Sequence, residues 1–143
     1  MATTCTVGIS SDISSGFSGI SRSMTLTKAG TLIDITETTG FSRRKLASTT
    51  GVDIITMANE LVEPSDNTAA KVYVKNIGHN GVIDKSTYVT VSIGDTGGTP
   101  QPIGRLYGGD WALFPVTVVD DKDIVITPEK DDAVVIEYIM FFE

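Results

Sequence analysis

The sequence predicts an all-β protein, either an antiparallel β-sandwich or a jelly roll, with an extended Ser/Thr/Gly-rich N-terminal arm. Short segments of alternating apolar and polar residues recur along the chain, and turn residues separate them at roughly 8–12-residue spacing. No long helical pattern interrupts them. Because 143 residues fit one ordinary domain, we expect the arm over residues 1–22 and a single sandwich over residues 23–143.

The N-terminal part is rich in small polar residues. The segment 10–23 has few bulky side chains, which indicates an extended arm or loop. Residues 24–27 alternate as a half-buried strand does, and residues 31–36 predict another strand after Gly30. Residues 52–62 fit a short helix or a strand followed by a polar loop, and the pattern does not decide between them.

From Lys71 onward the alternation is regular. Asn80 and Gly81 favour a tight hairpin turn because both residue types tolerate positive φ, so we expect the strands on either side, 71–78 and 87–93, to form a hairpin. Further strands are predicted at 103–107, 111–116, 123–127 and 133–142.

The last of these strands is apolar on both faces. Val134, Ile136, Tyr138, Met140 and Phe142 share one face by alternation. The opposite face combines Val135, Ile139 and Phe141 with Glu137. Such a strand is expected either to lie in the core between two layers or to be covered by another subunit.

Residues that could carry catalysis are scarce. Cys5, the single cysteine, lies in a Thr-rich predicted strand and is interpreted as an inert thiol, while His79, the single histidine, is expected in an exposed turn. No nucleophile–base set or phosphate-binding motif is present, so we expect no enzyme and no cofactor. Acidic residues gather in two turns, which we interpret as solvated turns rather than a metal site: Asp120, Asp121 and Asp123, then Glu129, Asp131 and Asp132.

The net charge of −7 argues against a nucleic-acid partner, because an acidic surface repels phosphate. The basic cluster Arg43-Arg44-Lys45 is either a solvated face or a dock for an acidic neighbour, such as the acidic third of another subunit. No apolar run is long enough to span a membrane and the N-terminus lacks a secretory pattern, so we expect synthesis in the cytoplasm.

Residues 72–142 resemble small structural proteins of tailed bacteriophage virions. The resemblance follows the strand sequences Val72–Asn76, Tyr88–Val91, Ile103–Pro115 and Ile136–Phe141, with a Gly-Gly-Asp-Trp corner at residues 108–111. It implies a β-sandwich subunit without catalytic residues that forms homo-oligomers, of which a trimer is one form, and that binds the major capsid protein or other virion proteins.

The expected function is therefore that of a capsid decoration or cement protein, made in the host cytoplasm and located on the virion. A tail, neck or baseplate component is the alternative within the same class. A carbohydrate-binding module is the alternative of another class, with Trp111, Tyr107 and Tyr73 as its possible aromatic platform. For the assembly role the predicted interface residues are Val135, Ile139, Phe141, Trp111, Arg43 and Arg44.

Overall fold

The computed structural model describes residues 2–10, 12, 19–35, 37–60, 69–131 and 133–143. Nearly all of its regular structure is β, which confirms the predicted fold class. The only helix in this part of the chain is a single turn, α1 (Met57–Glu60). The strands are β1 (Thr3–Ile9), β2 (Ile20–Leu26), β3 (Ser42–Leu46), β4 (Val52–Ile55), β5 (Ala69–His79), β6 (Tyr88–Ile93), β7 (Gln101–Tyr107), β8 (Trp111–Thr117), β9 (Ile124–Pro128) and β10 (Val134–Phe142).

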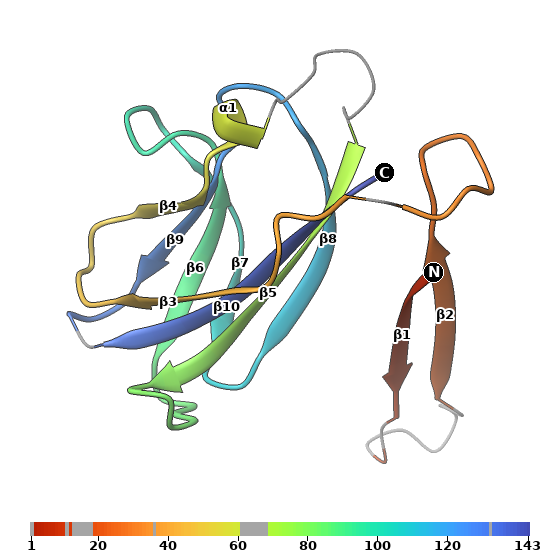
Figure 1. Cartoon of the computed structure of the whole chain (residues 1–143). Helices are drawn as coiled ribbons and strands as arrows, with labels where there is room; N and C mark the ends of the chain where they lie inside the picture. The colour runs from red at the N-terminus through yellow and green to blue at the C-terminus, as the bar shows by residue number, and fades with distance from the viewer. Residues whose placement is uncertain (1, 11, 13–18, 36, 61–68, 132) are drawn as a thin grey trace.

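Strands β3 to β10 form a two-layer sandwich (Figure 1). One antiparallel sheet has the order β3-β10-β5-β8 and the other has the order β4-β9-β6-β7. With β3 counted as the first strand, these orders are 1-8-3-6 and 2-7-4-5. Consecutive strands therefore cross between the layers repeatedly, which is the strand arrangement of an eight-stranded jelly roll.

The core lies between the two sheets because alternate side chains of each strand point inward. Val72 and Val74 of β5 and Ile126 of β9 are fully buried there. The face of β10 that was predicted as one apolar row also packs in this core, through Val134, Ile136, Tyr138, Met140 and Phe142. The residues between them, Val135, Glu137, Ile139 and Phe141, therefore point to the opposite surface of the β3-β10-β5-β8 sheet, which is the outer face of the sandwich.

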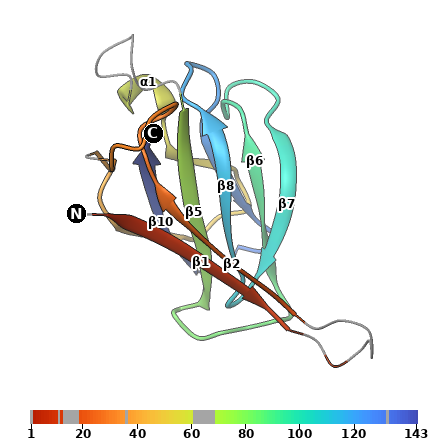
Figure 2. The same cartoon turned by 90° about the vertical axis from the view of Figure 1, so that its right-hand side faces the viewer.

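In the described residues, the N-terminal segment expected as an extended arm takes the form of a two-stranded hairpin beside the sandwich. Strand β1 pairs with β2 in antiparallel register from Thr3–Leu26 to Ile9–Ile20. The two strands make a separate sheet, which crosses in front of β10, β5 and β8 (Figure 2). β2 continues past residue 22, where the arm was expected to end, and it includes Ile20–Ser23, which the sequence assigned to the arm or loop.

Three local predictions met different outcomes. Asn80 and Gly81 do form the tight turn, with φ of 48° and 83°, but β5 and β6 belong to different sheets, so the predicted hairpin is wrong. The strand predicted at 31–36 is also wrong where it is described: one bridge joins Thr27 to Asp34, and Leu32 is 97% exposed. Residues 52–60 contain both alternatives in succession, a strand and then a helical turn, while 61–62 lie outside the described residues.

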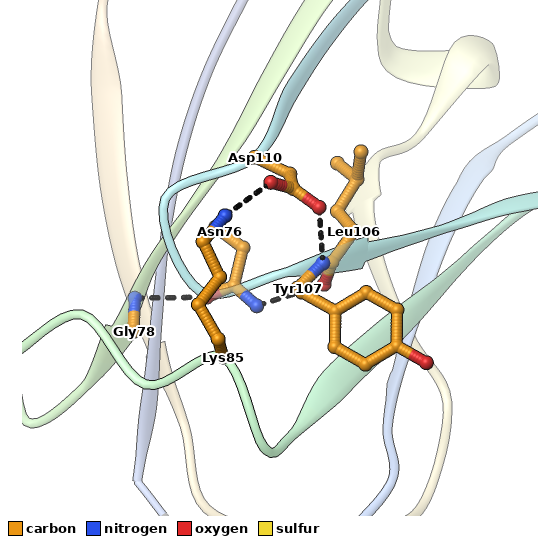
Figure 3. A network of polar contacts seen from close by, with 6 residues as sticks. All are labelled: Asn76, Gly78, Lys85, Leu106, Tyr107 and Asp110. Atoms are coloured by element: carbon orange, nitrogen blue, oxygen red, sulfur yellow. Dashed lines mark hydrogen bonds and ion pairs between the residues drawn. The ribbon is translucent and has the colours of Figure 1, made fainter. Parts of the chain in front are cut away.

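A polar network ties the Gly-Gly-Asp-Trp corner to the core (Figure 3). Asn76 is 1% exposed and donates through its side chain to the Leu106 carbonyl, 2.9 Å away. One Asp110 carboxylate oxygen accepts a hydrogen bond from Lys85 Nζ at 2.5 Å, and the other accepts one from the Tyr107 N–H at 3.1 Å. These bonds lower the pKa of Asp110, mainly through Lys85.

In the described part of the chain, no helix is long and apolar enough to cross a membrane.

Candidate assembly surface

The outer face carries the apolar residues that the sequence singled out on β10. Val135, Ile139 and Phe141 are each half-buried and lie on this face by alternation with the core residues. Ile139 pairs with Tyr73 of β5, which in turn pairs with Leu113 of β8. A continuous apolar row therefore runs across three strands of the sheet.

Trp111, also predicted as an interface residue, extends this row at the start of β8. Its ring lies next to that of Tyr73, with centroids 6.2 Å apart and planes inclined by 36°. Trp111 is 47% exposed, which is unusual for the largest apolar side chain. Burial raises the pKa of the Tyr73 phenol, and the negative charge of Glu137 raises it further.

The two arginines predicted as interface residues make contacts with different parts of the sandwich. Arg43 lies on the outer face, where its guanidinium contacts the Glu137 carboxylate at 2.6 and 2.7 Å. The same guanidinium lies 5.9 Å from the Phe41 ring centroid, so it also makes a cation–π contact. Arg44, the next residue along β3, instead donates to the Asp53 carbonyl at 2.9 Å and thereby joins β3 to β4 of the other sheet. Only Arg43 of the pair belongs to the apolar surface.

The N-terminal hairpin and the outer face together line a groove of about 550 Å³. The hairpin contributes Leu26 and the residues of β1 from Thr3 to Thr6, including the half-buried Cys5. The sandwich contributes Phe41, Tyr73, Lys75, Trp111, Leu113, Ile139 and Phe141. Most of the exposed lining is apolar, so the groove suits an apolar occupant better than a charged one.

The aromatic platform considered for glycan binding is split by the fold. Tyr73 and Trp111 meet on the outer face, but Tyr107 lies on the other sheet, where its ring is 5.5 Å from that of Tyr88. There Arg105 stacks over Tyr88 at 4.3 Å. Two of the three candidate residues therefore remain together.

Acidic side chains gather in a combination that the sequence did not indicate. Asp53, Asp95 and Asp123 each place a carboxylate oxygen within 4.8 Å of the others. Burial is the main cause that raises the pKa of Asp123, and the negative charges of Asp53, Asp95 and Asp120 add to it. Protein groups already bond each of the three carboxylates: the Met57 N–H bonds Asp123, Thr96 bonds Asp53 and the Gly97 N–H bonds Asp95. Of the described residues in the two predicted acidic turns, only Asp123 belongs to this group, and Asp132 lies outside the described residues.

Sequence reasoning missed Phe41 and the N-terminal hairpin as parts of this surface. Phe41 precedes β3 in a segment without strand alternation, so no local pattern marked it. Leu26 is 2% exposed and caps the hairpin against the sandwich. The alternation of Cys5, Val7 and Ile9 could have revealed an amphipathic hairpin, because it repeats with period two. The matching row Ile20, Met24 and Leu26 has the same spacing but is interrupted by Arg22.

No protein-family model matches this chain, and no curated protein matches it. A solved structure of Bacillus endospore appendages, described as a novel family of disulfide-linked pili, aligns over 78% of this chain and 93% of that chain. The identity is 20% and the TM-score is 0.42, so the likeness is distant and carries no argument about function.

Proposed function

We propose that this chain is a structural subunit that works by assembly, and that it decorates the capsid of a tailed-phage virion as a cement protein. The observation that carries the assembly role is the apolar outer face with its exposed Trp111 and its groove. The virion setting is supported by the resemblance of residues 72–142 to structural proteins of such particles. The jelly roll is compatible with that setting, since viral capsid domains use it, although the same fold serves other functions.

The physical basis of cementing is the burial of apolar area at several contacts. Each contact gains about 25 cal/mol per Å² of apolar surface removed from water. Trp111 and Leu113 of the edge strand β8 and Phe141 of β10 offer such surface on the outer face. Arg43 lies on the opposite edge strand β3, and Lys75 lies on β5 between them. Attachment through several copies multiplies weak contacts into stable binding.

The test is binding to particles that lack the protein. Purified chain is added to phage particles made without its gene, and bound copies are counted after sedimentation. We expect saturation at a fixed copy number and a higher melting temperature of the shell. Trp111→Ala is expected to weaken binding by about tenfold or more, as truncation of an aromatic anchor at an interface does. Ile103→Ala is the matched control, because Ile103 is also about half exposed, at 49%, but lies on β7 of the other sheet.

Two results of the same experiment would contradict parts of the proposal. Failure of the chain to bind, together with its absence from native particles by mass spectrometry, would refute the virion role. Density for the chain on the tail or neck instead of the shell would refute cementing but keep the structural class.

Carbohydrate binding is the second candidate, and the adjacent rings of Tyr73 and Trp111 favour it. Sugars stack on such exposed aromatic faces, and jelly rolls also occur in lectins. A glycan array would support this function if specific binding disappears in Trp111→Ala and persists in Tyr107→Ala. Tyr107 serves as the control because it lies on the opposite sheet.

A further inference from the structure

The N-terminal hairpin is amphipathic. By its register, Cys5 faces Met24 and Ile9 faces Ile20, and these side chains share one face with Val7 and Leu26. The same face also carries Thr3, opposite Leu26, and Arg22, opposite Val7, so it is mostly but not wholly apolar. The other face carries Thr, Ser and Gly: Thr4, Thr6, Gly8, Ser21, Ser23 and Thr25. A hairpin with one apolar face is built to lie against an apolar surface.

Its own sandwich covers only part of that apolar face. Leu26, at the end of the hairpin next to the sandwich, is 2% exposed, and Cys5 is half-buried. Toward the tip, Met24, Ile20 and Ile9 are 43%, 42% and 52% exposed. The hairpin also stands apart from the sandwich over much of its length (Figure 1), with the groove in between. A lone two-stranded hairpin is marginally stable in water. Contacts between its exposed apolar side chains and another apolar surface would therefore stabilise the hairpin.

The surface that fits the hairpin is the outer face, because the two already meet along one side of the groove. Leu26, Cys5, Leu113 and Ile139 line the same groove from opposite sides. Every other copy of the chain presents the same outer face. A contact made within one chain can be made between two identical chains at low cost, which is the basis of domain swapping.

We propose that the N-terminal hairpin is exchanged between copies, so that its apolar face covers the outer face of a second copy. The inference deepens the assembly role proposed above and rests on it: the outer face then joins copies of the chain to one another, and Trp111→Ala weakens attachment to particles by reducing the number of linked copies. The occupant of the groove is then the hairpin of another copy. The ten residues from Leu26 to Ile35 form a turn that is closed by the Thr27–Asp34 bridge and by the Ile35 N–H bond to the Leu26 carbonyl. If these few contacts open, the same ten residues span up to about 33 Å, which lets the hairpin leave its own sandwich. Reciprocal exchange closes a dimer, and sequential exchange closes a ring such as a trimer.

Complementation between two full-length variants tests the exchange. The donor-blocked variant carries Ile9→Asp and Ile20→Asp on the hairpin. The acceptor-blocked variant carries Trp111→Asp and Leu113→Asp on β8. In size-exclusion chromatography with light scattering, we expect wild type to be oligomeric at high micromolar concentration and each variant alone to be monomeric. An equimolar mixture is expected to form a heterodimer, because one partner supplies a working hairpin and the other a working face. Ile103→Asp is the control and is expected to remain oligomeric like wild type.

A second measurement does not depend on introducing charges. In a Leu113→Cys variant, a short bismaleimide can link Cys5 to the new thiol, since both positions line the groove. Mixed isotope-labelled and unlabelled chains are cross-linked and analysed by mass spectrometry. Exchange predicts links between a labelled and an unlabelled chain, at about half of all links. Links confined to single chains, or a wild type that stays monomeric, would overturn the inference.

The outcomes separate this inference from the proposed function. An exchanged oligomer that fails to bind particles contradicts the virion role alone. A monomer that binds particles contradicts the exchange alone, and it would mean that the capsid surface takes the place of the second copy.

Discussion

The side-chain amide of Asn76 donates a hydrogen bond to the Leu106 carbonyl, 2.9 Å away, and this bond joins β5 of one sheet to β7 of the other. The other polar groups of Asn76 are also paired. Its Oδ1 accepts from the Gly78 N–H at 2.8 Å, its N–H donates to Asp110, and its carbonyl accepts from the Gly109 N–H. One buried side chain thus holds the corner before β8, the strand that begins with Trp111 (Figure 3).

Replacing Asn76 by alanine is expected to destabilise the fold by roughly 1–3 kcal/mol, because the buried Leu106 carbonyl and Gly78 N–H lose their partners. Denaturant unfolding measures the change. Asn59→Ala is the control, since Asn59 is exposed on α1 and is expected to change stability by less than about 0.5 kcal/mol. Equal effects in the two variants would contradict a bridging role for Asn76.

The close approach of Gly108 to Asp84 gives a second prediction. A Cβ at position 108 would lie 2.2 Å from the Asp84 carbonyl oxygen and 2.6 Å from its nitrogen, so backbone would have to move. Gly108→Ala is expected to cost about 1–3 kcal/mol or more, as overpacking does. The matched control is Gly104→Ala in β7, where a Cβ meets nothing within 4 Å. Thermal unfolding of the pair would contradict the prediction if both variants melted together.

Local pattern predicts strands well in this chain but not their partners. Strands β5, β6 and β10 follow from period-two alternation, which depends on a few neighbouring residues. The Asn80-Gly81 turn formed as its residue types predict, yet β5 and β6 went to different sheets because pairing depends on contacts distant in sequence. At residues 31–33, the Thr31 hydroxyl bonds the Lys28 carbonyl and the Ile33 N–H, and this local turn prevails over strand propensity.

The candidate surface shows the same difference between what a local pattern predicts and what depends on contacts distant in sequence. The outer residues of β10 were predicted from the pattern of one strand, and Trp111 from the Gly-Gly-Asp-Trp corner and its aromatic ring. Phe41 and the hairpin were not, because they reach the groove only through the fold. The same holds for Asp53, Asp95 and Asp123, which come from three separate parts of the sequence.

The raised pKa of Asp123 predicts a pH dependence of stability. Because the folded pKa lies above the ordinary 3.8, the unfolded chain releases this proton first as pH rises. The contribution of Asp123 to stability therefore falls as pH rises from the unfolded pKa through the folded pKa, and it stays low above that window.

Asp123→Asn removes the charge and keeps an oxygen for the Met57 N–H, so it is expected to melt higher than wild type at neutral pH. The difference should vanish at a pH below 3.8, where both states of wild type hold the proton. Asp121→Asn, an exposed change nearby, is the control. A variant that is less stable than wild type at neutral pH would show that the carboxylate charge itself supports the fold.

The ion pair between Arg43 and Glu137 gives the last prediction. Glu137 is 8% exposed and lies between Arg43 of β3 and Lys75 of β5 in the strand register. The Arg43 side chain is 64% exposed, so water screens the ion pair from one side. Arg43→Ala is expected to cost about 1 kcal/mol, because the largely buried carboxylate loses the guanidinium that bonds it and keeps only Lys75 opposite it on β5. In a Glu137→Leu background the same change is expected to cost almost nothing, since no buried charge remains to be compensated. A double-mutant cycle in urea measures this coupling between Arg43 and Glu137.

Arg44→Ala in the same cycle is the control and should be additive with Glu137→Leu, because Arg44 bonds the Asp53 carbonyl instead. Additive effects of Arg43→Ala and Glu137→Leu would mean that the pair contributes nothing to the fold and that Arg43 is free to serve a partner on the outer face.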